Sequence, residues 1–149
     1  MDHIDYEILR QLEQNAKMTT KEIAAHVHLS APAVAERIKK LEQQQIITGY
    51  TTSIDFKKLD RSIVALVLFK STDCKKLAQF CYNHPDVLEC YRVAGEISYI
   101  AKVATQSVET LEQFIDQAMP FGTPSTNIVL SGHSNSIMSA NDSNQFNHL

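Results

Sequence analysis

Residues 18–41 carry the pattern of two short helices separated by a tight turn, and this pattern constrains the fold more than any other feature. Thr19 and Glu22 have the spacing of a capping box, in which each side chain bonds to the other residue's backbone amide. Ser30 is a suitable second N-cap, and Pro32 follows in the first helical turn, where its missing N–H costs nothing. Two defined helix starts this close together predict a helix-turn-helix, although an ordinary helical hairpin is the alternative.

Apolar residues of the two predicted helices fall on faces that can pack together. In the first helix Ile23 and Ala24 point the same way, and the small Ala24 allows a second helix to cross at close range. The apolar face of the second helix consists of Val34, Ile38 and Leu41. The opposite face of the second helix is therefore free to enter a major groove.

This outward face supplies the candidate DNA-binding residues. Small residues in the first turn let the backbone approach base edges, and lysines in the later turns can reach phosphates. Glu36 has the chemistry to accept a hydrogen bond from cytosine, or it lies on an ordinary solvated face. Two roles stay open for Arg37: a phosphate contact, or a brace to the preceding helices through a carboxylate such as Glu13 or Glu22. The predicted DNA-binding residues are Ser30, Ala31, Pro32, Ala33, Ala35, Glu36, Arg37, Lys39 and Lys40.

The charge of the chain does not by itself indicate a nucleic-acid partner. The net charge of the 149 residues is −3, and the first fifty residues hold six lysines or arginines against seven aspartates or glutamates. Affinity for DNA grows with the number of phosphates neutralised, so a near-neutral domain gains affinity by presenting several copies to one duplex. If the motif binds DNA, the composition therefore favours an oligomer.

The sequence offers no pattern for a metal, a cofactor or a membrane. Cys74, Cys81 and Cys90 match neither a metal-binding nor a disulfide spacing, so we expect buried thiols. His26 and His28 point in different directions at a helix end and do not form a metal-ligand pair. The longest apolar run, residues 63–69, is too short to span a bilayer, and no secretory leader is recognisable. We expect a cytoplasmic protein without cofactor, metal or membrane partner.

Other segments organise the chain around the motif. Asp2 is the expected cap of a preceding helix, which makes three helices in all. The β-branched segment Ile46–Ile54 predicts a strand leaving this domain, and residues 55–61 read as a linker. From residue 62 the pattern predicts the order strand, helix, strand, strand, helix, strand. The predicted strands are Ile63–Phe69, Val87–Val93, Ser98–Ala104 and Asn127–Ser131, and the helices are Lys75–Asn83 and the one that Ser107 caps.

This order predicts an α+β fold. A winged-helix-like helix-turn-helix domain occupies residues 1–54, including the exit strand. Residues 55–61 form the linker, and residues 62–134 form a ferredoxin-like βαββαβ domain for regulation and dimerisation, with both helices on one face of an antiparallel sheet. Because Ile63–Phe69 is apolar on both faces, we expect the other face of the sheet to meet a partner. The polar residues 135–149 are expected to be a disordered tail.

The chain resembles the Lrp/AsnC family of feast/famine transcription regulators from Asp2 to Ser134. The resemblance implies a DNA-binding transcription regulator of amino-acid-related metabolism, which is not an enzyme. It also implies assembly into dimers, tetramers or octamers on double-stranded DNA, with a free amino acid bound between dimers. The matching residues are Ile4-Asp5, Ile8-Leu9, Glu22-Ile23-Ala24, Leu29-Ser30, Val34, Arg37-Ile38, Leu41, the exit Ile46–Tyr50 and the pattern of the C-terminal half.

In this family the effector binds near the loop between the second and third strands of the regulatory domain. Gly95 and Tyr99 match the family pattern of Gly, two residues, Asp, Tyr, but Ser98 stands where the family has aspartate. A hydroxyl gives a ligand ammonium group only a neutral hydrogen bond, roughly half as strong as a charge-assisted one, and Glu96 is a potential substitute. The predicted effector-binding residues are Ala94, Gly95, Glu96, Ser98, Tyr99, and Ser125 and Thr126 at the start of the opposing strand.

Two other functions compete with this interpretation. Siroheme decarboxylases also resemble the family, but such a site needs cationic or imidazole side chains gathered over the regulatory sheet. Only Arg92, Lys102 and His133 are available there. The third interpretation is a small-molecule sensor that does not bind DNA, which the near-neutral charge permits.

Overall fold

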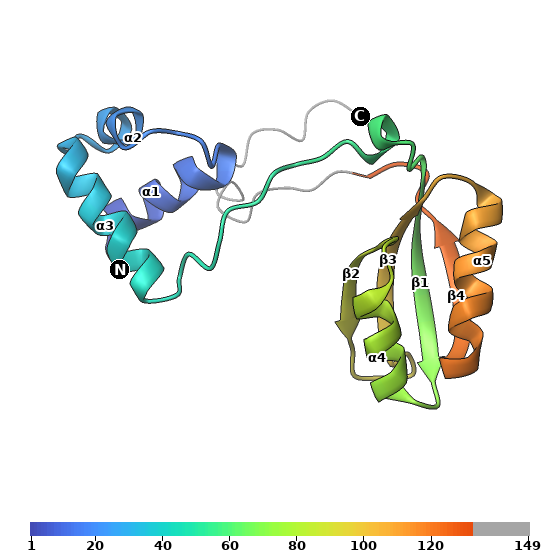
Figure 1. The fold of residues 1–149 in the computed structure, drawn as a ribbon. Coiled ribbons are helices and arrows are strands. Elements are labelled where there is room, and N and C mark those ends of the chain that lie inside the picture. The colour runs from blue at the N-terminus through green and yellow to red at the C-terminus, as the bar shows by residue number, and fades with distance from the viewer. Residues whose placement is uncertain (133–149) are drawn as a thin grey trace, which may run out of the picture. The chain divides into compact units, whose positions relative to one another are not determined.

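The computed structural model describes residues 1–132, so the tail predicted at 135–149 lies outside the described residues. The described chain forms two compact units, residues 1–53 and residues 54–132 (Figure 1). Within residues 1–132 we find no helix that is long and apolar enough to cross a membrane.

The first unit consists of the three predicted helices, α1 (His3–Gln14), α2 (Thr20–Val27) and α3 (Ala31–Gln43). Asp2 and Thr19 form reciprocal capping boxes with Asp5 and Glu22, and the hydroxyl of Ser30 accepts from the amide of Ala33. These side chains bond the amides at the helix N-termini, which have no partner inside the helix. The helix starts expected from the sequence are confirmed.

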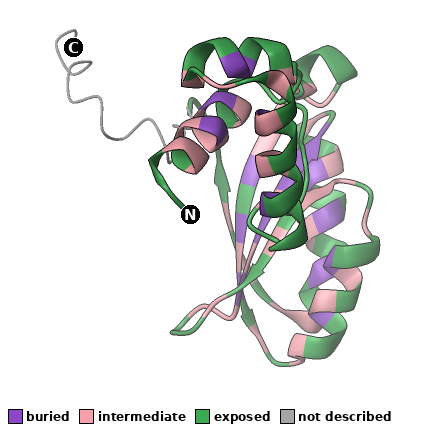
Figure 2. Cartoon of the chain, turned by 90° about the vertical axis from the view of Figure 1, so that its left-hand side faces the viewer, coloured by how far each residue is buried: buried purple, intermediate pink, exposed green. Residues whose placement is uncertain are grey.

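The core of the first unit lies where the three helices meet. It is formed by fully or nearly fully buried side chains (Figure 2), and Ala24 is the small residue among them. Between α2 and α3 His28 adopts the left-handed conformation with φ 55°, and its amide donates to the carbonyl of Ala24. Histidine tolerates this geometry better than most side chains. The buried core residues are Ile8, Ile23, Ala24, Val34 and Leu41.

The strand predicted at Ile46–Ile54 is not formed. The chain instead folds back on the end of α3, where the carbonyl of Leu41 accepts from the amides of Ile46 at 2.9 Å and Ile47 at 3.2 Å. The hydroxyl of Tyr50 donates to Glu42 at 2.9 Å. A strand requires a neighbouring backbone to pair with, and the described chain places none beside this segment. A short 3-10 helix, η1 (Phe56–Leu59), follows.

The second unit is a four-stranded antiparallel sheet with two helices. The strand order β2-β3-β1-β4 puts β1 at the centre, hydrogen-bonded to β3 on one side and to β4 on the other. The predicted ferredoxin-like α+β arrangement is confirmed. In chain order the elements are β1 (Ile63–Ser71), α4 (Cys74–Asn83), β2 (Val87–Arg92), β3 (Tyr99–Thr105), α5 (Val108–Ala118) and β4 (Gly122–Ile128).

The last strand begins earlier than the sequence predicts. It spans Gly122–Ile128 and not Asn127–Ser131, because its backbone pairs along β1 from Ser71 opposite Gly122 to Ala65 opposite Ile128. Pro124 lies within this strand, which is tolerated because β4 is at the edge of the sheet. Gly122 and Pro124 have low strand propensity, so the sequence does not indicate where this strand begins. The pairing with β1 determines its start.

The two faces of the sheet differ in what covers them. On the inner face Ala65, Val67 and Phe69 are completely buried and pack against α4 and α5 through residues such as Leu77 and Phe114 (Figure 2). On the outer face the alternate residues of β1 remain partly accessible, although they are also apolar. These outer residues are Val64, Leu66 and Leu68, and Leu66 is 37% exposed.

Candidate nucleic-acid interface and effector loop

Helix α3 presents most of the predicted DNA-binding residues to solvent. Six of the nine are exposed, namely the N-cap Ser30 and five residues within the helix, and the other three, Ala31, Ala33 and Arg37, are half-buried. The first turn carries only small side chains and Pro32, so its backbone is open to approach by a base edge. The five exposed helix residues are Pro32, Ala35, Glu36, Lys39 and Lys40.

Arg37 connects α3 to the start of α1. Its Nη1 atom lies 2.8 Å from an oxygen of Asp2 and 2.7 Å from an oxygen of Asp5. The brace expected through Glu13 or Glu22 is therefore made with a different pair of carboxylates. Glu22 is occupied in its own capping box, where it accepts from the amide and hydroxyl of Thr19.

Several hydrogen bonds shift the pKa values of this cluster. The Asp5 amide and the Arg37 guanidinium hold the pKa of Asp2 below its ordinary value. The Asp2 amide and Arg37 lower the pKa of Asp5 in the same way, and the two carboxylates together raise the pKa of Arg37. All three groups are thus stabilised in their charged forms.

Ion pairing redistributes the charge of the first unit. Arg10 pairs with Glu7 at 2.7 Å, and Arg37 pairs with Asp2 and Asp5. The side chains of four lysines, in contrast, make no ion pair or hydrogen bond with the described residues: Lys17, Lys21, Lys39 and Lys40. The net charge of the unit is near neutral, but its unpaired positive charge lies on lysines.

Lys21 is a further candidate that the sequence analysis did not include. It is exposed in the first turn of α2, directly after the capped start at Thr19. The first helix of a helix-turn-helix crosses the DNA backbone, so a cation there has access to a phosphate. The sequence signal that could have identified Lys21 is its position close after the capping residue Thr19.

The predicted effector loop joins β2 to β3 and is held by backbone contacts. Gly95 has φ 139°, a conformation that favours glycine. The Ser98 amide donates to the carbonyl of Phe69 at 2.8 Å, and the Ser98 hydroxyl accepts from the amide of Ser71 at 3.2 Å. Ala94 and Glu96 are exposed at the tip. Ser98 therefore already has a structural role at the end of β1.

Glu96, the alternative partner for a ligand ammonium, forms an ion pair with Lys70. The lysine lowers the pKa of this carboxyl through their hydrogen bond. Both side chains are more than half exposed, so the pair is accessible to water and weak. A ligand ammonium at Glu96 competes with Lys70.

Ser125 and Thr126 do not lie at the start of the last strand, because β4 begins at Gly122. They are opposite Leu68 and Val67 of β1, so the strand alternation directs them to opposite faces of the sheet. Strand β1 separates them from β3. The structure thus brings the five loop residues together and puts Ser125 and Thr126 on the other side of the central strand.

The cations considered for a decarboxylase site are also separated. Lys102 lies opposite Leu66 and pairs with Glu89 at 3.0 Å on the outer face. Arg92 lies opposite Tyr99, whose ring belongs to the buried inner core. Arg92 and Lys102 are therefore on opposite faces of the sheet, and His133 is outside the described residues.

Comparison with protein families gives two matches that together cover most of the chain. Residues 1–42 match an AsnC-type helix-turn-helix domain, and residues 62–137 match the Lrp/AsnC ligand binding domain. An uncharacterized HTH-type transcriptional regulator of Bacillus subtilis, YezC, is 45% identical over 134 residues, which are 90% of this chain and 96% of that protein. The regulator LrpC of the same organism is 31% identical, covering 88% of this chain and 92% of its own length.

Solved structures agree with this result. The structure of B. subtilis LrpC has a TM-score of 0.86 with 29% identity, covering 91% of this chain and 99% of that chain. The feast or famine regulatory protein of Mycobacterium tuberculosis, complexed with L-methionine, has a TM-score of 0.83 with 26% identity, covering 91% and 96%.

We expect the Arg37 cluster to make the stability of the protein depend on acid pH. The pKa values of Asp2 and Asp5 are lowered in the folded state, so the unfolded state binds more protons as pH falls below about 4. The stabilisation is complete above the unfolded pKa and is lost as pH falls through the lowered folded values. Thermal unfolding of wild type and Arg37→Gln, measured by circular dichroism between about pH 2 and pH 7, tests this.

In Arg37→Gln the melting temperature should be lower at neutral pH, and the difference from wild type should shrink on acidification. Lys39→Gln, which removes an unpaired lysine of the same helix, is the control and should follow the wild-type profile. Identical profiles for all three proteins would contradict the assignment of Arg37 as a brace.

Proposed function

Because the chain belongs to the Lrp/AsnC family of transcriptional regulators, we propose that α3 contacts duplex DNA and that several copies act together. The chain combines a helix-turn-helix DNA-binding domain with the ligand-binding domain of the family. The proposal also concerns which residues contact DNA, how many copies assemble and which effector binds.

The observation that carries the DNA contact is the pairing of charges in the first unit. Asp2 and Asp5 pair with Arg37, and Glu7 pairs with Arg10, whereas Lys39 and Lys40 are exposed on α3 without a partner among the described residues. These two lysines follow the small first turn along the same helix. We assign them to phosphates, and the backbone of the first turn to base edges. Lys21 is an additional phosphate contact from α2.

Few phosphate contacts for each copy give weak binding, so assembly is part of the proposal. The outer face of the sheet supports it, since Val64, Leu66 and Leu68 are apolar and incompletely covered in the single chain. Packing against a second copy buries this face and links two helix-turn-helix units. The linked units gain affinity through their high effective concentration on one duplex. We infer a dimer or a multiple of it.

A free amino acid is the effector class that we propose for the loop at 94–99. The M. tuberculosis relative is described as a complex with L-methionine. In this chain Ser98 and the paired Glu96 offer less to a ligand ammonium than a free carboxylate does, so we expect weak binding. Regulation of amino-acid-related metabolism follows from that effector class. A cytoplasmic location and the absence of catalysis stay predictions.

Replacing Lys39 and Lys40 together by alanine should weaken DNA binding and reduce its salt dependence. Each lost phosphate contact lowers the slope of log affinity against log salt by about 0.9, or about 1.8 for both. Gel-shift titrations on genomic fragments at several salt concentrations measure the slope. Thermal stability should barely change, because both side chains are exposed.

The matched control is the alanine double variant of Lys57 and Lys58, which are also adjacent, exposed and unpaired within the described residues but belong to η1. It removes the same charge and should leave the salt slope unchanged. Equal slopes for all three proteins would remove α3 from the DNA interface.

Sedimentation of the purified chain should give a dimer or a multiple of it at micromolar concentration. Leu66→Glu should shift it toward monomer, since it places a second carboxylate beside the Lys102–Glu89 pair without a counter-charge of its own, and burying such a charge in an interface costs about 3–5 kcal/mol. That cost corresponds to more than about a hundredfold in dissociation constant. Val108→Glu adds the same charge to an exposed site on α5 and should leave the assembly intact. A wild-type protein that sediments as a monomer would contradict the proposed assembly.

Ser98→Asp should strengthen binding of free amino acids. A charge-assisted bond to the ligand ammonium contributes about 1.5–3 kcal/mol, which is about tenfold or more in affinity. Calorimetry of both proteins with a panel of amino acids decides the matter. Tight binding by wild type that is lost in Glu96→Gln would assign the ammonium to Glu96 instead. If neither protein binds an amino acid, the loop at 94–99 serves only as a turn between β2 and β3.

A further inference from the structure

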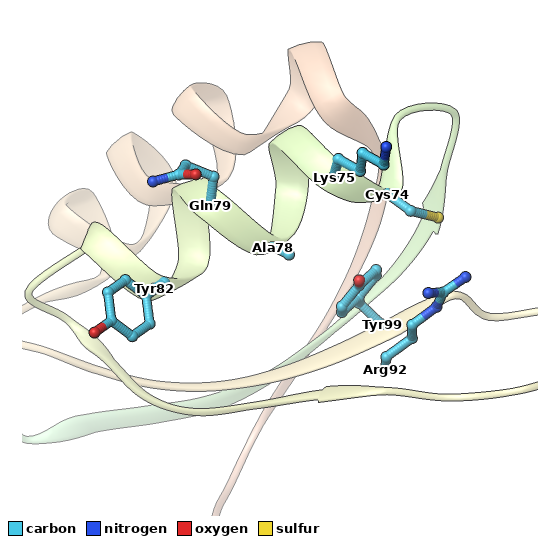
Figure 3. A pocket seen from close by; sticks show the side chains of 7 residues that line it. All are labelled: Cys74, Lys75, Ala78, Gln79, Tyr82, Arg92 and Tyr99. Atoms are coloured by element: carbon cyan, nitrogen blue, oxygen red, sulfur yellow. The ribbon is translucent and has the colours of Figure 1, made fainter.

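A groove of about 550 Å³ lies on the helical side of the second unit, between α4 and the ends of β2 and β3. Cys74 and Lys75 line it from the first turn of α4, and Ala78 lines it from the next turn (Figure 3). Arg92 and Tyr99 rise from the strands beneath the helix. They are a cross-strand pair, so both side chains are on the inner face of the sheet.

The two cations of this groove are unpaired. Elsewhere in the second unit Lys70, Lys76 and Lys102 each pair with a carboxylate, and Arg61 pairs with Asp86 at 3.4 Å. Lys75 and Arg92, in contrast, make no ion pair or hydrogen bond through their side chains with the described residues. No aspartate or glutamate lines the groove. Two positive charges thus share one hollow without a neutralising group.

Tyr99 provides a phenol hydroxyl at the same place. The residue is only 7% exposed, and its ring packs in the core with Phe69, which lies opposite it on β1. Its hydroxyl has no hydrogen-bond partner among residues 1–132, although the residue lines the groove. Because the hydroxyl is not a buried atom, it opens into the groove, where it has no partner from the described residues. A ligand oxygen in the groove would supply one.

The lining also defines the chemistry of the ligand. Arginine and lysine suit anionic oxygens, and the phenol hydroxyl donates to the same kind of acceptor. Ala78, Cys74 and the ring of Tyr82 add apolar surface for a short hydrocarbon body. An ammonium group has no carboxylate to meet and is repelled by both cations. We propose that the groove binds a small organic carboxylate without an ammonium group, such as a 2-oxo acid.

This site adjoins the amino-acid contact proposed for the loop at 94–99 and shares Tyr99 with it. That contact depends on Ser98 and Glu96 at the tip of the loop, whereas the groove depends on Lys75 and Arg92 beneath α4. A 2-oxo acid carries an oxo group where the corresponding amino acid carries an ammonium group. With one site for each compound, the chain can distinguish the two. Substitutions of Lys75 or Arg92 act on the groove, and substitutions of Ser98 or Glu96 act on the loop contact, so these variants let the two proposals fail independently.

Calorimetry on the full chain tests the groove with pyruvate, 2-oxoisovalerate and 2-oxoglutarate, and with L-valine and inorganic phosphate as comparison ligands. At least one 2-oxo acid should bind at about millimolar concentration or below. Lys75→Gln and Arg92→Gln should each weaken that binding about fivefold to tenfold, and Tyr99→Phe about threefold. Lys76→Gln, the neighbouring lysine that pairs with Asp73, is the control and should bind like wild type.

Three outcomes would overturn the proposal. One is the failure of all three 2-oxo acids to bind at about 10 mM. Another is binding of L-valine as tight as that of 2-oxoisovalerate and equally sensitive to Arg92→Gln, which would show that the groove does not exclude an ammonium. The third is binding of inorganic phosphate alone, which would assign the cations to a different anion.

Cys74 offers a second measurement that needs no ligand identity. The two other cysteines are less reactive, because burial raises the pKa of Cys81 to about 12 and also raises the pKa of Cys90. The anionic reagent dithionitrobenzoate should react with Cys74 faster, relative to neutral dithiodipyridine, than it does with a free thiol. The ratio of rates should fall about fivefold when Lys75 and Arg92 are both glutamine.

Cys74→Ser should abolish the fast reaction, and Lys76→Gln should leave the ratio unchanged. A bound 2-oxo acid should slow the reaction of Cys74 with both reagents. A ratio that is the same in wild type and in the double glutamine variant would mean that the groove does not attract anions, and would refute the proposal.

Discussion

A central strand that is apolar on both faces governs the second unit. Ala65, Val67 and Phe69 form the floor of a core that α4 and α5 cover. Their neighbours Leu66 and Leu68 point the other way and have no covering element in the described chain. Apolar side chains on both faces of one strand are stable only when both faces are covered. The second face is therefore the physical basis of the proposed assembly, which would compensate for the few phosphate contacts of each copy.

The first unit reconciles a near-neutral composition with binding to a polyanion through the way its charges are paired. Capping boxes and ion pairs occupy Asp2, Asp5 and Glu22 within the fold. Arginine is used for the internal contacts, where its planar group bonds two carboxylates. Lysines are left on the surface, where a phosphate can replace water. The ion pairs that fix the helices therefore use arginines, and the exposed cations of α3 are Lys39 and Lys40.

The second unit offers two chemically different places for a small molecule. At the tip of the loop Glu96 and Lys70 neutralise each other, and Ser98 is bonded to the amide of Ser71. Beneath α4 the cations remain unpaired, and the hydroxyl of Tyr99 opens into the groove without a partner among the described residues. Free energy is gained where a ligand satisfies groups that the protein leaves unsatisfied. By that criterion the groove is the better prepared of the two, and it favours an acid without an amine.

Local signals in the sequence determined the helices and the general order of strands. Asp2, Thr19 and Ser30 bond to amides within three residues of themselves, so their effect is written in adjacent positions. The α+β order and the helix-turn-helix followed from such signals. Pairing between distant segments was decided by tertiary structure alone. Strand β4 starts at Gly122 because β1 offers it an edge, and residues 46–54 form no strand because nothing pairs with them. Arg37 joined Asp2 and Asp5, and Lys75 approached Arg92, because packing brought distant residues together, which no local propensity encodes.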